Sequence, residues 1–580
     1  MLSILINWLY MGGLVFLTGT ALVQIYMRLV GKTDKDMSER KPAIAHILFS
    51  GIMGTTLYAQ VFSLFYRVNW EANLVLVMLA AVYGINQRHF IRELIAGWRR
   101  DCFSPAADGS GKGKRWRLLP DLLILLAVFS FALASSGAVK LIDTDWYHAQ
   151  TIRWIEEFGC VKGVANLFPA LGYNNAQHYF DALFSMNWAF GQSIRGSGGF
   201  FGLVIFIHGL LRVFRWKQHT CHTADMLAVW EVAYSIIITA FFTEPYTDTL
   251  PNGLVLFILT EWLSLLEEKR EDTEALGFYC LLAVFAAVCK MAVVMSVLLA
   301  AYPAYLLLKQ RRMGRILMYL GMGAVIALPF LITNVITTGY PVYLLSAVDF
   351  LDVRWKMDPA ILRYSVDSMI AFARMPSATI EEALGSGFGW IPSWFRAESF
   401  SHQILYVTIL FFLLYDLVHI LRGLIKKEAL DFRMLWPRLC VCAGLVYWFF
   451  TIPQVKYCWA FLIFPVAVIP MYYWERGKHT LMHYALLSAA LAVLLMYGGF
   501  YSLRTLGYMK EGLVHYPVLQ ADYKRYDFHR VEKNGQDFYI RKENGDIACG
   551  YYVFPYLDSV EVLDSLAVGD SLGEGFYMED

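Results

Sequence analysis

Two acidic residues stand directly after a long apolar run, where their carboxylates could do chemistry. Asp143 and Asp145 are two residues apart, and apolar residues recur at helical spacing in the segment 146–155 that follows them. This pattern predicts an amphipathic helix in the membrane interface, with both acids at the boundary between lipid and water. Burial raises the pKa of a carboxyl group, so an Asp held there is suited to act as a general base. The alternative is that one of the two acids only caps the helix.

A second acidic segment follows about a hundred residues later. Glu244 and Asp248 lie in the short turn 243–252 between two apolar runs. An acid there could orient an acceptor or support a base in the first segment. The alternative is an ordinary proline-containing turn with solvated acids. The candidate catalytic residues are therefore Asp143, Asp145, Asp248 and Glu244.

Basic residues on the same predicted side could bind a phosphate group. Arg354 and Lys356 lie in the long segment 336–402, and Lys456 lies in a tight turn. Arg forms paired hydrogen bonds to phosphate oxygens, and Lys supplies a compact positive charge. The alternative for Arg354 and Lys356 is snorkelling at the membrane interface. The candidate substrate-binding residues are His148, Arg153, Tyr340, Tyr343, Arg354, Lys356 and Lys456.

The composition shows what kind of chain must position these residues. Of 580 residues, 58% are hydrophobic and only 17% are charged, and 49 basic residues nearly balance 48 acidic ones. A soluble enzyme would carry roughly 25% charged residues, and a nucleic-acid-binding protein would need a basic excess. The apolar residues come in unbroken runs and not in alternation, which excludes a transmembrane barrel. The sequence therefore predicts an all-α polytopic membrane protein without a nucleic-acid partner.

Hydropathy predicts about fourteen membrane helices, each near the roughly 20 residues that cross a bilayer. The run 275–308 is divided at Lys290, because a charge in the middle of a membrane helix is costly. The predicted helices are 3–28, 44–66, 72–87, 118–140, 198–214, 225–243, 251–267, 275–289, 291–308, 315–335, 403–422, 434–452, 458–474 and 481–501.

Charge in the short loops predicts the orientation. Lys and Arg gather in alternate loops, which the positive-inside rule assigns to the cytoplasm. Both termini, the loops 141–197 and 336–402 and the tail 502–580 are then outside. The turn pairs Asn534-Gly535 and Asn544-Gly545 predict a small β-meander in this tail. Cys160 and Cys549 are the cysteines expected in outer segments, where either a disulfide or two separate thiols is possible, the latter being favoured.

Four polar residues fall within the predicted membrane helices. They are His208, Glu231, Glu261 and Asp416. A transporter would use such groups as proton relays. The favoured alternative is that each pairs with a polar neighbour or snorkels toward a helix end.

The order of these features resembles the GT-C superfamily of membrane glycosyltransferases, which use sugars linked to polyprenyl phosphate. The resemblance rests on the acidic segment after the fourth helix, the acidic turn two helices later, and the segment 339–343 (Gly-Tyr-Pro-Val-Tyr) after seven helices. Asp143-Thr144 with Tyr147-His148 also resembles an uncharacterised family of bacterial polytopic proteins that look GT-C-like. Two features differ from the superfamily: three helices precede the module, and Asp143-Thr144-Asp145 replaces an adjacent Asp-Glu pair.

The resemblance implies an organisation in six parts. These are a three-helix extension (1–88), a basic cytoplasmic loop (89–117), a GT-C-like seven-helix module (118–335) that includes the outer loop 141–197, an outer loop (336–402), a four-helix segment (403–501) and an outer tail (502–580). It also implies an integral protein of the bacterial plasma membrane.

The implied function is transfer of a sugar from a polyprenyl-phosphate donor to an envelope glycan, lipid or protein on the outer face. Asp143 is the preferred base, because it lies nearer the helix end than Asp145. No cofactor is required beyond the lipid carrier, and the need for a divalent metal stays open. Two other functions are alternatives: a polysaccharide polymerase or ligase, or a transporter or flippase. The polymerase or ligase would rely on Arg354, Arg374, Arg396 and His402.

Overall fold

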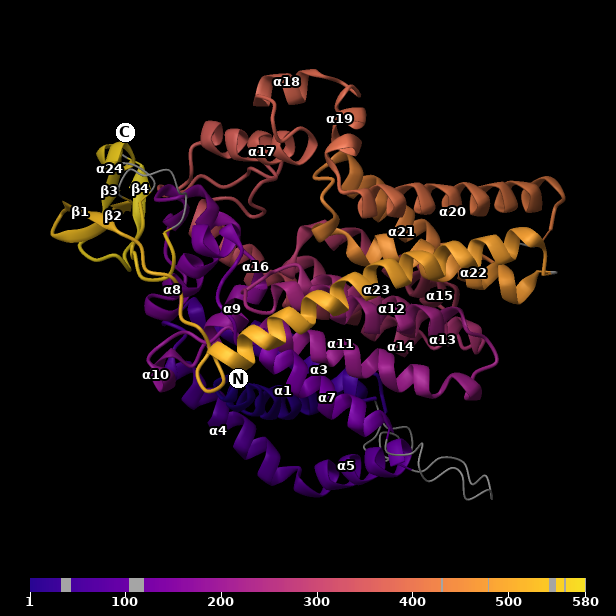
Figure 1. The fold of residues 1–580 in the computed structure, drawn as a ribbon. Helices are drawn as coiled ribbons and strands as arrows, with labels where there is room; N and C mark the ends of the chain where they lie inside the picture. The colour runs from indigo at the N-terminus through magenta and orange to yellow at the C-terminus, as the bar shows by residue number, and fades with distance from the viewer. Residues whose placement is uncertain are drawn as a thin grey trace.

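Long helices lie side by side through the molecule, and both chain termini lie at one end of them (Figure 1). The computed structural model describes residues 1–32, 43–103, 119–428, 431–477, 479–541, 549–557 and 560–578. The backbone amides of Leu2 and Ser3 donate to the carbonyls of Pro517 and Val518, at 3.1 and 2.9 Å. We call this the loop end, since it also holds the segments 141–197, 339–399 and 516–578.

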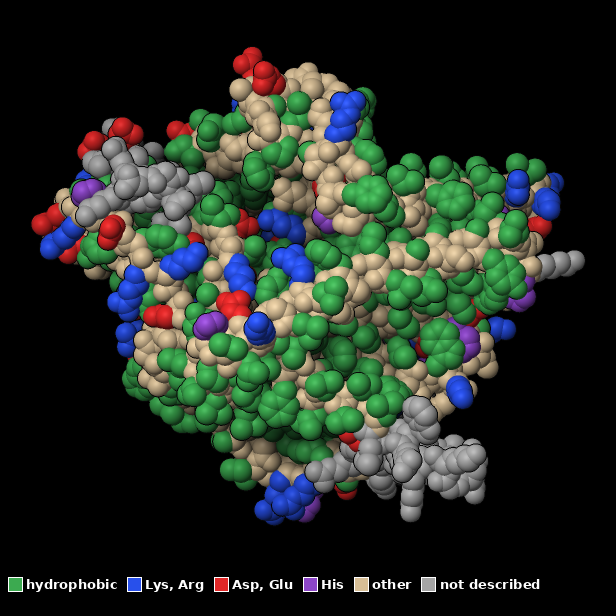
Figure 2. Space-filling view, viewed as in Figure 1, with side chains coloured by type: hydrophobic (Ala, Val, Ile, Leu, Met, Phe, Trp, Pro, Cys, Tyr) green, Lys and Arg blue, Asp and Glu red, His purple; other side chains and the backbone are tan. Residues whose placement is uncertain are grey.

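Nine helices in the described part of the chain are long and apolar enough to cross a membrane. A tenth is obtained if α4 (Trp70–Asn86) and the first part of α5 (Arg88–Phe103), which meet at 81°, form one bent span. Hydrophobic side chains cover the flank of the bundle, whereas charged ones gather mainly toward its two ends (Figure 2). The chain is therefore an integral membrane protein, as the composition predicts.

The prediction of fourteen spans is not supported by these helices. α7 (Leu119–Ser135) and α14 (Thr273–Cys289) have 17 residues each, which is short of the roughly 20 that a bilayer needs. α21 (Phe432–Phe450) carries two arginines, and α22 (Trp459–Arg476) ends in Glu475 and Arg476. Charges at these positions lower the hydropathy that the neighbouring apolar residues supply.

The first two membrane helices pack closely through glycines. α1 (Leu2–Leu29) and α3 (Ile44–Ser63) approach so closely that a Cβ on Gly51 would lie 1.8 Å from the carbonyl oxygen of Val15. A Cβ on Gly19 would lie 1.9 Å from the carbonyl oxygen of Ile47. Small residues at such a crossing let two helix backbones come into contact.

In the middle of the bundle, the apolar run 275–308 is divided into two helices at Lys290, as predicted. α14 ends at Cys289, the backbone of Lys290 is extended, and η6 begins at Met291. α14 and η6 pack against each other as a hairpin, and the ammonium group emerges at the loop end. The elements here are α11 (Ser197–Phe214), η4 (Trp216–Gln218), α12 (Thr223–Ile237), η5 (Ile238–Phe241), α13 (Thr249–Glu267), α14, η6 (Met291–Ala300), α15 (Ala301–Lys309) and α16 (Met313–Thr338).

The four polar residues predicted within membrane helices all have partners. His208 Nδ1 lies 2.5 Å from Glu231 Oε2, and His208 Nε2 lies 3.1 Å from Glu261 Oε1. Arg438 of α21 donates to Asp416 at 2.8 Å. The second partner of this pair comes from α20 (Phe400–Ile425), and the last membrane helix is α23 (Leu481–His515).

Short helices make up the two long segments at the loop end. The segment 141–197 holds the π-helix η1 (Thr144–His148), α8 (Ala149–Glu157), η2 (Val164–Asn166), η3 (Pro169–Gly172), α9 (Ala176–Leu183) and α10 (Asn187–Phe190). The segment 339–399 holds α17 (Pro359–Arg374), α18 (Ile380–Gly385) and α19 (Trp390–Ala397). The predicted amphipathic helix exists as η1 and α8, but its apolar face meets protein and not lipid. Trp154 is buried against Phe554 and Phe576 of the tail, at ring distances of 4.8 and 5.8 Å.

The described residues of the tail form two small antiparallel sheets, where the sequence predicts one meander. β1 (Phe528–Lys533) pairs with β2 (Gln536–Arg541), and β3 (Leu566–Val568) pairs with β4 (Phe576–Met578), after the short helix α24 (Val560–Asp564). Asn534 and Gly535 join β1 and β2 with φ angles of 52° and 72°, as a type I′ turn requires. The second predicted turn, Asn544-Gly545, lies outside the described residues.

The two cysteines considered for a disulfide have different neighbours. The Cys549 thiol donates to the carbonyl oxygens of Asp145 and Trp146, at 3.3 and 3.0 Å. The Cys160 thiol lies 3.9 Å from the carbonyl oxygen of Thr333. No disulfide joins these two residues, so the favoured alternative of separate thiols is confirmed.

Candidate functional site

Two aspartate–lysine pairs meet around one tyrosine ring at the loop end. Asp143 Oδ2 lies 3.0 Å from Lys456 Nζ, and Asp248 Oδ1 lies 3.0 Å from Lys290 Nζ. Both ammonium groups lie over the Tyr457 ring, with its centroid 4.7 Å from Lys290 Nζ and 5.1 Å from Lys456 Nζ. We call these five residues the paired-charge site. It brings two carboxylates and two ammonium groups together around one ring.

Local structure explains how Asp143 is held. It immediately precedes the π-helix η1, an irregularity that is frequent at functional sites. The extended stretch before it is fixed by Glu244, whose Oε1 accepts the backbone amides of Lys140 and Leu141 at 2.7 and 3.3 Å. Burial raises the pKa of Glu244, although the hydrogen bond from the Lys140 amide opposes the shift. Glu244 therefore ties the two acidic segments together and does not face the paired-charge site.

Lys456 is positioned by a contact with the central helix α13. It lies in η7 (Val455–Tyr457), between α21 and α22. Asn252 of α13 accepts the amide of Ala460 at 3.0 Å and donates to the carbonyl of Lys456 at 3.4 Å. Burial lowers the pKa of Lys456, but Tyr457, Asp143 and Asp248 raise it further than burial lowers it. The side chain thus stays a cation beside Asp143.

A layer of neutral groups lies next to the paired charges. His148 Nδ1 and His178 Nε2 are 2.7 Å apart, and both rings are buried. Burial lowers the pKa of both imidazoles, and the cation Lys290 adds to the effect, so that the pKa of His178 falls to about 3. The Tyr147 ring lies 4.1 Å from the His148 ring and is tilted against it, and burial raises the pKa of the Tyr147 hydroxyl. The histidine pair is therefore uncharged at neutral pH.

Tyr343 connects to this layer through two aromatic rings, whereas Tyr340 does not. Tyr147 and Tyr173 are 5.5 Å apart, and Tyr173 and Tyr343 are 5.9 Å apart. The Tyr343 hydroxyl donates to the carbonyl of Pro169 at 3.0 Å. The Tyr340 hydroxyl donates within its own loop, to the carbonyl of Met357 at 3.0 Å.

Asp145 and Arg153 hold the C-terminal tail. The Asp145 carboxylate accepts the Tyr526 hydroxyl at 2.7 Å and lies 3.5 Å from Lys524 Nζ. Its backbone carbonyl accepts the amides of Cys549 and Gly550, at 2.9 and 2.7 Å. Arg153 donates to the carbonyl of Tyr551 at 2.9 Å. These two predicted site residues therefore face the tail and not the paired-charge site.

The predicted phosphate clamp is also placed elsewhere. The Arg354 guanidinium lies 5.1 Å from the ring of Tyr577 in the tail. Lys356 Nζ pairs with Asp349 at 2.5 Å. Their charges are engaged locally, so the cations at the site are Lys456 and the unpredicted Lys290.

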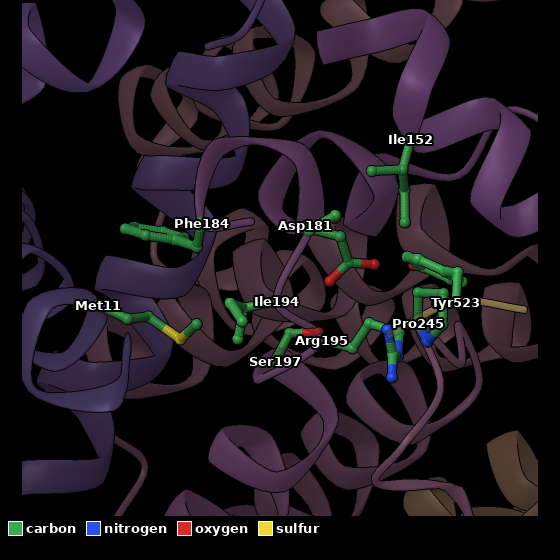
Figure 3. Close-up of a pocket in the computed structure, with 10 residues that line it drawn as sticks. Met11, Ile152, Asp181, Phe184, Ile194, Arg195, Ser197, Pro245 and Tyr523 are labelled. Atoms are coloured by element: carbon green, nitrogen blue, oxygen red, sulfur yellow. The ribbon is translucent and has the colours of Figure 1, made fainter. Parts of the chain in front are cut away.

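A small internal cavity lies beside the turn that carries Glu244. Asp181, Arg195 and Tyr523 converge on it, with Ser197 and Pro245 in its wall (Figure 3). The Arg195 guanidinium donates to the carbonyls of Thr243 and Ala521, at 2.8 and 2.5 Å. Burial raises the pKa of Asp181 to about 7. Through these two hydrogen bonds Arg195 links the acidic turn to the tail, next to the cavity.

Within the described ranges, no group of three or more His, Cys, Asp or Glu side chains is arranged to hold a metal ion. The paired-charge site instead gives each carboxylate a lysine partner.

Comparison with known proteins identifies a family but no activity. The family described as a domain of unknown function (DUF8201) matches residues 1–463, which is most of the chain and includes the whole paired-charge site. Neither the curated proteins nor the solved structures give a match.

Proposed function

We propose that this chain, which belongs to the DUF8201 family, is a membrane glycosyltransferase. It transfers a sugar from a polyprenyl-phosphate-linked donor to a cell-envelope acceptor at the loop end, on the outer face of a bacterial plasma membrane. The observation that carries the proposal is the paired-charge site, which puts a candidate base and two candidate phosphate-binding cations around Tyr457.

The proposed reaction needs only groups of this kind. Asp143 accepts the proton of an acceptor hydroxyl as its oxygen bonds to the anomeric carbon of the sugar. The bond between this carbon and the phosphate oxygen breaks, and the negative charge remains on the lipid phosphate. Lys456 and Lys290 stabilise that charge, because ammonium groups form strong hydrogen bonds to phosphate oxygens. Asp248 keeps Lys290 in place.

The location at the loop end supports a lipid-linked donor. The Lys and Arg bias of the short loops favours an orientation with this end outside the cell. Nucleotide sugars are made in the cytoplasm, so an outer site requires a donor that has already been carried across the membrane. The predicted module 118–335 contains Asp143, Asp248 and Lys290, and Lys456 follows from the C-terminal helices.

The alternatives lack a comparable constellation among the described residues. A polymerase or ligase would use Arg354, Arg374, Arg396 and His402, and three of these, Arg354, Arg374 and His402, face different partners. Arg374 donates to the carbonyl of Phe450 at 2.5 Å, and His402 Nδ1 pairs with Glu398 at 2.7 Å. A transporter would use His208 with Glu231, and these are already paired inside the bundle.

The test is a transfer assay with the purified full-length protein. Polyprenyl-phosphate sugars labelled in the sugar are incubated with the protein and with membrane extracts as the source of acceptor. We expect the label to move to a larger product, and Lys456→Gln to reduce the rate strongly. Lys356→Gln is the matched control, since it removes a lysine at the same end that pairs elsewhere. Equal loss in both variants, or no transfer from any donor in the panel, would reject the proposal.

A further inference from the structure

We propose that the Asp143–Lys456 pair is a latch that an incoming phosphate group opens. In the resting protein the carboxylate of Asp143 forms an ion pair with the ammonium group of Lys456. A lipid phosphate takes its place, and Asp143 is released at the moment when a donor is present. The identity of the phosphate ligand rests on the proposed function, whereas the exchange itself is a property of the two side chains.

The Asp143–Lys456 pair is accessible enough to exchange, and the other pair is not. The side chains of Asp143 and Lys456 are 28% and 31% exposed. The Asp248 side chain is only 4% exposed, and Lys290 has a second neighbour in the Thr247 hydroxyl at 3.4 Å. Separation of a buried carboxylate from its cation is costly, because water cannot replace the partner. The exchange is therefore confined to Asp143 and Lys456, and the second pair stays closed.

The charges of the paired-charge site cancel, so a phosphate must compete with Asp143 for Lys456. Two carboxylates and two ammonium groups cancel, and the histidine pair beside them is neutral because burial and Lys290 lower both imidazole pKa values. The resting site has no net positive charge with which to attract an anion. A phosphate must compete with Asp143 for Lys456, and its two or more oxygens give it the advantage of several hydrogen bonds.

Both cations lie close to the same aromatic ring. Lys290 Nζ and Lys456 Nζ are 4.7 and 5.1 Å from the same ring centroid, so the two nitrogens are less than 10 Å apart. Rotation of the flexible Lys456 side chain away from Asp143 brings its ammonium group toward a ligand above Tyr457. The donor then binds first, and the acceptor hydroxyl meets an unpaired Asp143 only afterwards.

The test is a binding measurement that needs no sugar transfer. Citronellyl phosphate, a short prenyl phosphate, is titrated into purified full-length protein in neutral-lipid nanodiscs by calorimetry. We expect Asp143→Asn to bind it about fivefold more tightly than the wild type, because the competing carboxylate is gone. Lys456→Gln should bind it more weakly, and the double variant should bind as Lys456→Gln does. Asp145→Asn is the matched acidic control and should leave the affinity unchanged.

Each possible outcome bears on a different part of the latch. Equal or weaker binding by Asp143→Asn, with an unchanged melting temperature, would overturn the exchange. A gain that persists in the double variant would overturn the assignment to Lys456. The same gain with inorganic phosphate would identify a free phosphate and not a lipid phosphate as the ligand. A fivefold gain in a protein that transfers no sugar would keep the latch and reject the transferase.

Discussion

Asp143 and Asp145 are two residues apart, yet replacement of each by Asn should have opposite consequences. Asp143 faces Lys456, and its side chain is 28% exposed. Asp145 is buried, accepts the hydroxyl of Tyr526 and lies near Lys524. The Asn side chain keeps the shape of Asp but cannot take up a proton. We therefore expect Asp143→Asn to lose activity without losing stability, and Asp145→Asn to do the reverse.

The expected magnitudes follow from these surroundings. Loss of a general base costs roughly 10²–10⁴ in rate, or about 3–5 kcal/mol in the barrier. A partly exposed ion pair contributes at most about 1 kcal/mol to folding, so the melting temperature of Asp143→Asn should change little. Asp145→Asn weakens a buried hydrogen bond to a charged acceptor, which costs about 1.5–3 kcal/mol. It should loosen the tail but leave the rate per folded molecule within about a factor of three of the wild type, a change of under 1 kcal/mol in the barrier.

Three measurements on each variant decide the matter. Transfer from labelled polyprenyl-phosphate sugar gives the rate, thermal melting in detergent gives the stability, and limited proteolysis reports whether the tail is attached. The reasoning is refuted if Asp143→Asn transfers at the wild-type rate while Asp248→Asn is inactive, since the base would then be the other acid. Loss of rate in a stable Asp145→Asn protein with a protected tail would show that Asp145 takes part in the chemistry.

Three further predictions concern stability. Gly51→Ala should lower the melting temperature, by an overpacking cost of about 1–3 kcal/mol against the backbone of α1, whereas Gly13→Ala, which meets nothing within 4 Å, should not; equal effects would disprove the close crossing. Asp416→Asn leaves the guanidinium of Arg438 buried without its counterion and should lower the free energy of unfolding by about 3–5 kcal/mol. Joint replacement of Asp416 by Leu and Arg438 by Met should lower it less, and a larger loss in the double variant would contradict this. Burial raises the pKa of Glu156 from 4.5 to about 7, so the folded state holds this proton to higher pH than the unfolded state, and the melting temperature should fall as pH rises from 4.5 to 7. Glu156→Gln should flatten this dependence of the melting temperature on pH, and an unchanged dependence would exclude Glu156 as its source.

The class of fold was predictable because each membrane helix is marked by a run of apolar residues that are adjacent in the sequence. Long apolar runs define a helical membrane protein, and the single charge at Lys290 marks the turn between α14 and η6. The Asn534-Gly535 pair likewise defines one hairpin turn, since both residues adopt positive φ angles. Nine or ten of the fourteen predicted spans have a counterpart among the described helices that are long and apolar enough, because hydropathy counts apolar residues without reporting where each helix ends. The α8 helix was misplaced at the membrane surface because its apolar face is covered by residues four hundred positions away.

The candidate site was predicted only in part, for the same reason. Asp143, Asp248 and Lys456 were recognisable as charged residues beside membrane helices. Lys290 carried a signal that was interpreted only as a helix break, although a lone cation between two apolar runs needs a partner. His178 carried none, because its contact with His148 spans thirty residues of irregular chain. Arg354 and Lys356 looked equally suitable, but the sequence does not reveal that Tyr577 and Asp349 already engage them.

The divergence of Asp143 and Asp145 explains why their spacing alone could not assign the base. Two acids separated by one residue look as if they should act together, for instance on one metal ion. Asp143 precedes the π-helix η1 and Asp145 lies within it, so their side chains leave the backbone in different directions. One meets Lys456 from the C-terminal helices, and the other meets Tyr526 from the tail. The function of each acid is thus decided by the partner that the fold brings to it. A test of the base must therefore vary the partner as well as the acid, which is why Lys456→Gln belongs beside Asp143→Asn in every assay.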